Sequence, residues 1–172
     1  MHNHDDNTES SIVEYAKFVA VIALIFSASY FIYSLSDFSD GYEYMRIFMG
    51  VFLVVFAGFK FAGYNMFVMM FQGYDLIAKK SKLYAQLYPS IELALGVLFL
   101  ADLAPYPRNI TVLTLMGVGA VGVAQEIFHK RSGIRCACLG NIIKLPLSTV
   151  SLVENVSMVA MASVMIVRMV TT

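Results

Sequence analysis

Long apolar runs are the feature that most constrains how this chain can fold. Residues 18–35, "FVAVIALIFSASYFIYSL", and 50–59, "GVFLVVFAGF", contain no charged side chain. About 20 apolar residues form a helix that crosses a bilayer. Over its 172 residues the chain is 59% apolar and 14% charged, whereas a soluble domain carries about 25% charged residues. The sequence therefore predicts an all-α, polytopic transmembrane helical bundle embedded in a lipid bilayer.

The apolar runs divide into five predicted membrane spans in a single helical domain, residues 12–172. The leader, residues 1–11, is acidic and is expected to be disordered and cytoplasmic, and the first run is too long for a cleavable signal. The expected spans are residues 12–35, 44–61, 84–103, 109–128 and 148–169.

Basic residues are concentrated in two of the four connectors, which predicts the orientation. The connector after the second span carries Lys79, Lys80 and Lys82, and the one after the fourth carries Lys130, Arg131, Arg135 and Lys144. Because cytoplasmic loops are enriched in lysine and arginine, both connectors and the N-terminus are expected in the cytoplasm. The formal net charge is zero and no basic face is present, which argues against nucleic acid as a partner.

This topology brings scattered ionisable residues to the cytoplasmic ends of the spans. Ionisable groups inside a bilayer usually face the bundle interior and find partners there. We therefore expect one polar cluster that contains two thiols, three carboxylates and an amine. Its members are Cys136, Cys138, Glu92, Glu126, Glu154 and Lys60.

The only two cysteines, Cys136 and Cys138, form a C-x-C pair in the segment "RCACLGNIIKLPLS". Their Cα atoms are separated by roughly 5.5–7 Å, the upper part of the range for a disulfide. A bridge between them would be strained and easily reduced, as labile and catalytic disulfides are. The pair equally suits a soft metal ion such as Cu(I). Both readings remain open from the residues alone.

Two segments of the chain resemble the MauE/DoxX family of redox-associated membrane proteins. One is "CACLG" followed by "LPLSTVSLVEN"; the other is "FKFAGYNMFVMMFQGYDLIAKKSKLYAQLYPSIELALG". The resemblance covers about residues 45 to 170 and implies a bacterial inner-membrane protein. It makes Cys136 and Cys138 the candidate redox pair and Gly140 its turn residue. The other matching positions are Lys60, Tyr74, Asp75, Pro89, Glu92, Glu154 and Asn155.

The leading hypothesis is a thiol–disulfide oxidoreductase that exchanges electrons with a redox partner protein, with a quinone as a candidate cofactor. The first alternative is a membrane protein that takes Cu(I) or Hg(II) on Cys136 and Cys138 from a metal-carrier partner. The second alternative is a non-catalytic accessory subunit of a membrane complex. As for assembly, the sequence fits both a homo-oligomer and a subunit of a larger complex. Asp75, Lys79 and Lys80 are expected on the exposed face of an interfacial helix.

Overall fold

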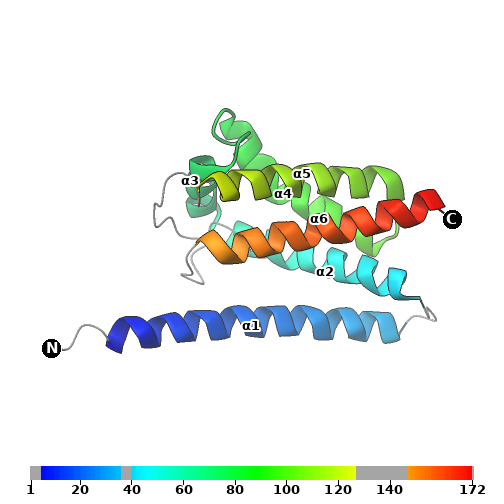
Figure 1. Cartoon of the computed structure of the whole chain (residues 1–172), viewed down its shortest axis with the longest axis horizontal. Helices are drawn as coiled ribbons and strands as arrows, with labels where there is room; N and C mark the ends of the chain where they lie inside the picture. Colours follow the sequence, from blue (N-terminus) through cyan, green and yellow to red (C-terminus); the bar gives the residue numbers. More distant parts are fainter. Residues whose placement is uncertain (1–4, 36–39, 127–146, 172) are drawn as a thin grey trace.

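The structure is a computed structural model that describes residues 5–35, 40–126 and 147–171. Within these residues the chain forms six helices (Figure 1). They are α1 (Asp5–Ser34), α2 (Gly41–Ala62), α3 (Tyr64–Tyr74), α4 (Lys82–Leu100), α5 (Pro105–Gln125) and α6 (Leu147–Thr171). Five of them, all but α3, are long and apolar enough to cross a membrane. The predicted all-helical bundle with five spans is confirmed, and the protein is a multi-pass membrane protein.

Two closely packed helix pairs form the centre of the bundle, α2 with α4 and α5 with α6. Glycines allow the backbones of α2 and α4 to approach closely, as small residues do between membrane helices. A Cβ added at Gly96 would lie 3.0 Å from the backbone nitrogen of Val54 and 3.1 Å from the carbonyl oxygen of Gly50. Any larger residue at this crossing would push the two helices apart.

The helix α1 lies at the edge of the bundle and packs mainly on α2 (Figure 1). Most of its side chains from Tyr15 onward are exposed, although Ile25 and Ser29 are fully buried. Exposed apolar residues are stable on this helix because lipid, not water, surrounds a membrane span.

The spans alternate in direction, so their ends gather at two opposite faces of the bundle (Figure 1). One face holds the start of α1, the short helix α3, the end of α5 and the start of α6. The other holds the end of α1, the start of α2, the turn between α4 and α5, and the C-terminus. We call these the α3 face and the α4–α5 turn face.

The connector between the second and fourth helices differs from the prediction in two respects. It contains α3, which the sequence pattern did not separate from the connector. Asp75, at the C-terminal end of α3, is fully buried and not exposed as expected, whereas Lys79 and Lys80 are exposed. The reason is that Asp75 closes a turn folded against the bundle, where its carboxylate accepts backbone hydrogen bonds from Ile77 and Ala78.

Candidate functional site

A buried ion pair between Lys60 and Glu92 is the centre of the candidate site. Lys60 lies in the last turn of α2 and Glu92 near the middle of α4. The Lys60 Nζ atom lies 2.6 Å from Oε1 and 2.5 Å from Oε2 of Glu92. The side chains are 2% and 0% exposed. Two opposite charges at this depth stabilise each other because water cannot screen them.

Aromatic rings enclose the Lys60 ammonium group. The ring centroids of Phe56, Phe67 and Tyr88 lie 5.9, 5.9 and 5.3 Å from Nζ. An ammonium group within about 6 Å of a ring centroid is attracted to the negative face of the ring. These rings come from α2, α3 and α4, so the short helix α3 completes the enclosure of the charge.

A small cavity beside Lys60 brings in two further predicted residues, Glu154 and Asn155 from the start of α6. About 10 Å³ of it is open to water, which is room for about one water molecule. Both side chains are buried, at 6% and 7% exposed. A Cβ added at Gly119 of α5 would lie 3.3 Å from Nδ2 of Asn155, so the glycine makes room for the amide.

The turn after α3 closes the same end of the bundle. Asp75 Oδ1 accepts hydrogen bonds from the backbone nitrogens of Ile77 and Ala78, at 2.9 and 2.8 Å. Burial raises the pKa of the Asp75 carboxyl above its ordinary value of 3.8, although these two hydrogen bonds act in the opposite direction. Gly122 of α5 packs directly against this turn, since a Cβ there would lie 2.7 Å from the carbonyl oxygen of Tyr74.

The structure thus brings together four of the predicted site residues, Lys60, Glu92, Glu154 and Asn155. Glu126 is also buried and caps the C-terminal end of α5 on the same face, but it does not line the cavity. Cys136, Cys138 and Gly140 lie outside the described residues. The segment that carries them joins Glu126 to Leu147, the start of α6.

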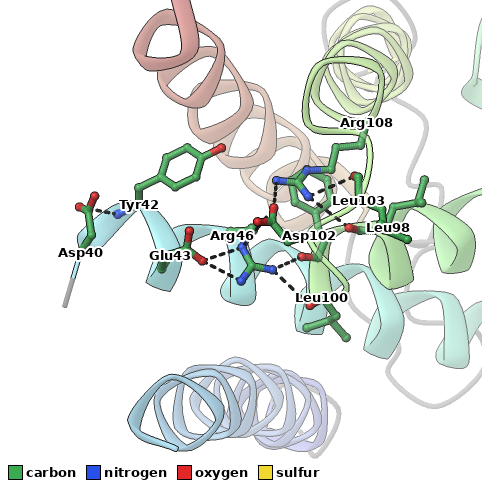
Figure 2. Close-up of polar contacts among 10 residues, drawn as sticks. Asp40, Tyr42, Glu43, Arg46, Leu98, Leu100, Asp102, Leu103 and Arg108 are labelled. Atoms are coloured by element: carbon green, nitrogen blue, oxygen red, sulfur yellow. Dashed lines mark hydrogen bonds and ion pairs between the residues drawn. The ribbon is translucent and has the colours of Figure 1, made fainter. Parts of the chain in front are cut away.

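A second charged cluster, at the α4–α5 turn face, was not predicted (Figure 2). Asp102 lies between two buried arginines, 2.8 Å from Nη2 of Arg108 and 3.6 Å from Nε of Arg46. Arg46 also pairs with Glu43, at 2.7 Å. The arginines donate hydrogen bonds to backbone carbonyl oxygens at the end of α4 and in the turn that follows it. Arg46 donates to Phe99 and Leu100, and Arg108 donates to Leu98 and Leu103.

This second cluster acts as a structural clamp. The last carbonyl groups of a helix have no partner within the helix. Here the two guanidinium groups donate to them, and the backbone N–H groups of Asp102 and Leu103 also donate to the carbonyl oxygens of Phe99 and Leu98. The sequence signal was present, because Arg46 and Arg108 lie at the ends of apolar runs, where arginine needs a partner. The positions of Arg46 and Arg108 in the sequence did not show that both side chains contact the end of α4.

The two clusters differ in what they can do chemically. The arginines are always charged, and they contact carbonyl oxygens and the Asp102 carboxylate. Lysine and glutamate can exchange protons. Lys60 and Glu154 line one small cavity, and Lys60 is paired with Glu92. Among the residues that the structure describes, no group of three or more histidine, cysteine, aspartate or glutamate side chains is placed to hold a metal ion.

Comparison with known proteins identifies the family. The family model described as methylamine utilisation protein MauE matches residues 15–168, from within α1 to the last turn of α6. No curated protein and no solved structure matches the chain. Since the match covers most of the chain, including Lys60, Glu92, Glu154 and Asn155, the chain belongs to the family of the methylamine utilisation protein MauE.

Proposed function

We propose that this chain is a thiol–disulfide protein of the bacterial inner membrane. In the proposed reaction Cys136 and Cys138 lose two protons and two electrons and form a disulfide, while a partner disulfide is reduced to a dithiol. Exchange proceeds by attack of a thiolate on a disulfide sulfur. The C-x-C pair and the membership of the MauE family support this chemistry.

The observation that carries the proposal is the proton-exchanging group formed by Lys60, Glu92 and Glu154. Thiolate chemistry needs an acid or base to take up and return protons. The group lies at the face of the bundle where the segment with both cysteines begins and ends, after Glu126 and before Leu147. Glu154 is the member nearest in the chain to Cys138, and we assign it the transfer of protons between the thiols and the cavity.

The proposed orientation places the α3 face in the cytoplasm. Lys79, Lys80 and Lys82 are exposed and belong to the connector on this face, in agreement with the enrichment of positive charge in cytoplasmic loops. Cytoplasmic thiols are kept reduced. The cysteine pair therefore acts as an electron donor in this proposal, and its electrons go to a partner protein or to a carrier within the membrane.

Thiol labelling in membrane vesicles of both orientations tests the proposal. The protein is equilibrated in a graded series of redox buffers and its free thiols are alkylated with a membrane-impermeant reagent. We expect a reversible two-electron transition that is lost in both Cys136→Ser and Cys138→Ser, with labelling in inverted vesicles. Glu154→Gln should slow re-oxidation of the pair, whereas Glu43→Gln at the opposite face should not.

Three results would contradict parts of the proposal. Thiols that stay reduced at every potential would exclude the redox pair, and their protection by stoichiometric Cu(I) or Hg(II) would favour metal handling. Full function of the Cys136→Ser variant in the cell would favour a non-catalytic accessory subunit. Labelling from right-side-out vesicles would reverse the orientation.

A further inference from the structure

An apolar groove opens between α1, α2 and α6, beside the proton-exchanging group. Its volume is about 320 Å³, within the range of about 300–1,000 Å³ that is usual for small-molecule sites. Four phenylalanines form much of its wall, and two polar side chains from α6 interrupt the apolar lining. They are Phe18, Phe26, Phe48, Phe52, Glu154 and Ser157.

Neighbouring aromatic rings form one wall of the groove. The Phe26 and Phe48 rings pack across the α1–α2 contact with their centroids 4.7 Å apart, and Phe48 and Phe52 lie 6.0 Å apart along α2. Aromatic rings prefer offset-stacked or edge-to-face neighbours at such distances. A planar ligand that entered between α1 and α6 would therefore meet aromatic rings of α1 and α2 on one side and the aliphatic and thioether side chains of α6 on the other.

Glu154 belongs to two cavities at once. It lines the apolar groove and also lines the small cavity that contains Lys60 and Asn155. A carboxyl group in this position can pass a proton from the interior of the bundle to a ligand in the groove. Carboxylates at membrane depth mark proton and substrate pathways.

We propose that the groove binds the ring of a membrane-soluble quinone, which accepts the electrons of the cysteine pair. In this reaction two S–H bonds break and one S–S bond forms, while the two C=O groups of the quinone become C–OH groups. Glu154 hydrogen-bonds to one quinone oxygen and supplies a proton to it, and Ser157 is a second polar contact. The inference rests on the proposed thiol chemistry, since the dithiol supplies the electrons.

The polar residues favour a quinone over a phospholipid acyl chain as the occupant. An acyl chain has no polar atom to meet Glu154 or Ser157, whereas a quinone oxygen can accept a hydrogen bond from a hydroxyl or from a protonated carboxyl group. The loosely packed α1 provides one wall, and its displacement would admit a ring directly from the bilayer.

Binding of decylubiquinone to the protein in nanodiscs tests the inference, measured by titration calorimetry. The first measurement uses the Cys136→Ser/Cys138→Ser double variant, so that binding is seen without thiol chemistry. We expect one ligand per chain and no comparable binding of 1-decanol, which has the same tail length but no ring. Ser157→Phe, which fills the groove, should weaken binding by about tenfold or more. Ser27→Phe, the same substitution on the lipid-facing side of α1, should not.

Glu154→Gln separates binding from chemistry in the chain with both cysteines. We expect this variant to bind decylubiquinone within about threefold of the unaltered chain, while its reduction of the quinone slows by about a hundredfold. An azido-benzoquinone photolabel provides a measurement that needs no variant to fold. The label should appear in peptides that contain residues 18–26 or 153–161.

Decylubiquinone binding that is unchanged by Ser157→Phe, or photolabel confined to other peptides, would overturn the quinone site. Equal binding of 1-decanol would show that the groove takes an alkyl chain and would also overturn it. These results leave the cysteine redox transition untouched. Conversely, specific quinone binding to a chain whose thiols never form a disulfide would refute the proposed thiol chemistry.

Discussion

Replacing the two members of the Lys60–Glu92 pair singly should destabilise the protein more than replacing both together. Lys60→Met and Glu92→Met are both close to isosteric, and each removes one charge from a site where both side chains are at most 2% exposed. Each single variant should lose about 3–5 kcal/mol of unfolding free energy, because it leaves an uncompensated buried charge. The Lys60→Met/Glu92→Met double variant should regain most of this loss, because an apolar pair of similar volume needs no desolvation of charge.

Unfolding by titration with sodium dodecyl sulfate in mixed micelles, followed by circular dichroism, measures these differences. The coupling free energy follows from the double-mutant cycle, and the Lys60–Glu92 distances of 2.5–2.6 Å predict a value well above about 1 kcal/mol. A cycle with Lys60→Met and Glu43→Met, whose sites are at opposite faces of the bundle, should be additive within about 0.5 kcal/mol. Additive effects for Lys60 and Glu92 as well would refute the argument that the two charges depend on each other.

Three further predictions concern packing and charge outside this pair. Gly122→Ala should lower the free energy of unfolding by about 1–3 kcal/mol, because its Cβ would lie 2.7 Å from a backbone oxygen. Gly117→Ala, whose Cβ would have no atom within 4 Å, should be neutral or stabilising in the same unfolding assay. The pKa of the Asp75 carboxyl is raised in the folded protein, so the folded state binds more protons than the unfolded state. The free energy of unfolding should therefore fall as the pH rises from the ordinary carboxyl pKa of 3.8 through the raised pKa. Asp75→Asn should flatten this part of the stability–pH curve. Arg46→Met should cost about 2–4 kcal/mol because carbonyl oxygens at the end of α4 lose a charged donor, and Arg46→Lys should recover only part of it, since lysine lacks the planar fork of donors.

The bundle and its approximate spans follow from the sequence because the bilayer imposes a strong, local requirement. A helix must satisfy its own backbone hydrogen bonds in lipid and be about 20 apolar residues long, and both properties can be read from consecutive residues. The helix α3 could not be predicted in this way, because its 11 residues are too few to cross the bilayer. Its place against α2, α4 and α5 depends on contacts between distant parts of the chain.

The cost of burying charge explains how much of the polar cluster could be predicted. Since Lys60, Glu92 and Glu154 all lie near the same ends of apolar spans, the alternation of helix direction alone puts them at one face of the membrane. The sequence could not show that Lys60 pairs with Glu92, or that Glu126 caps α5 and does not line the cavity. That choice depends on the rotation of each helix about its axis.

The sequence by itself determined the class of the protein, its five spans and the face at which its ionisable groups collect, because these depend on hydrophobicity and length along one segment at a time. Only the tertiary structure decided that Asp75 is buried, that Arg46 and Arg108 clamp the end of α4, and that Glu154 lies between the Lys60 cavity and an apolar groove. Those features depend on which faces of separate helices meet. In this protein the glycines at 50, 96, 119 and 122 set several of these contacts by letting backbones and side chains approach where a Cβ would keep them apart.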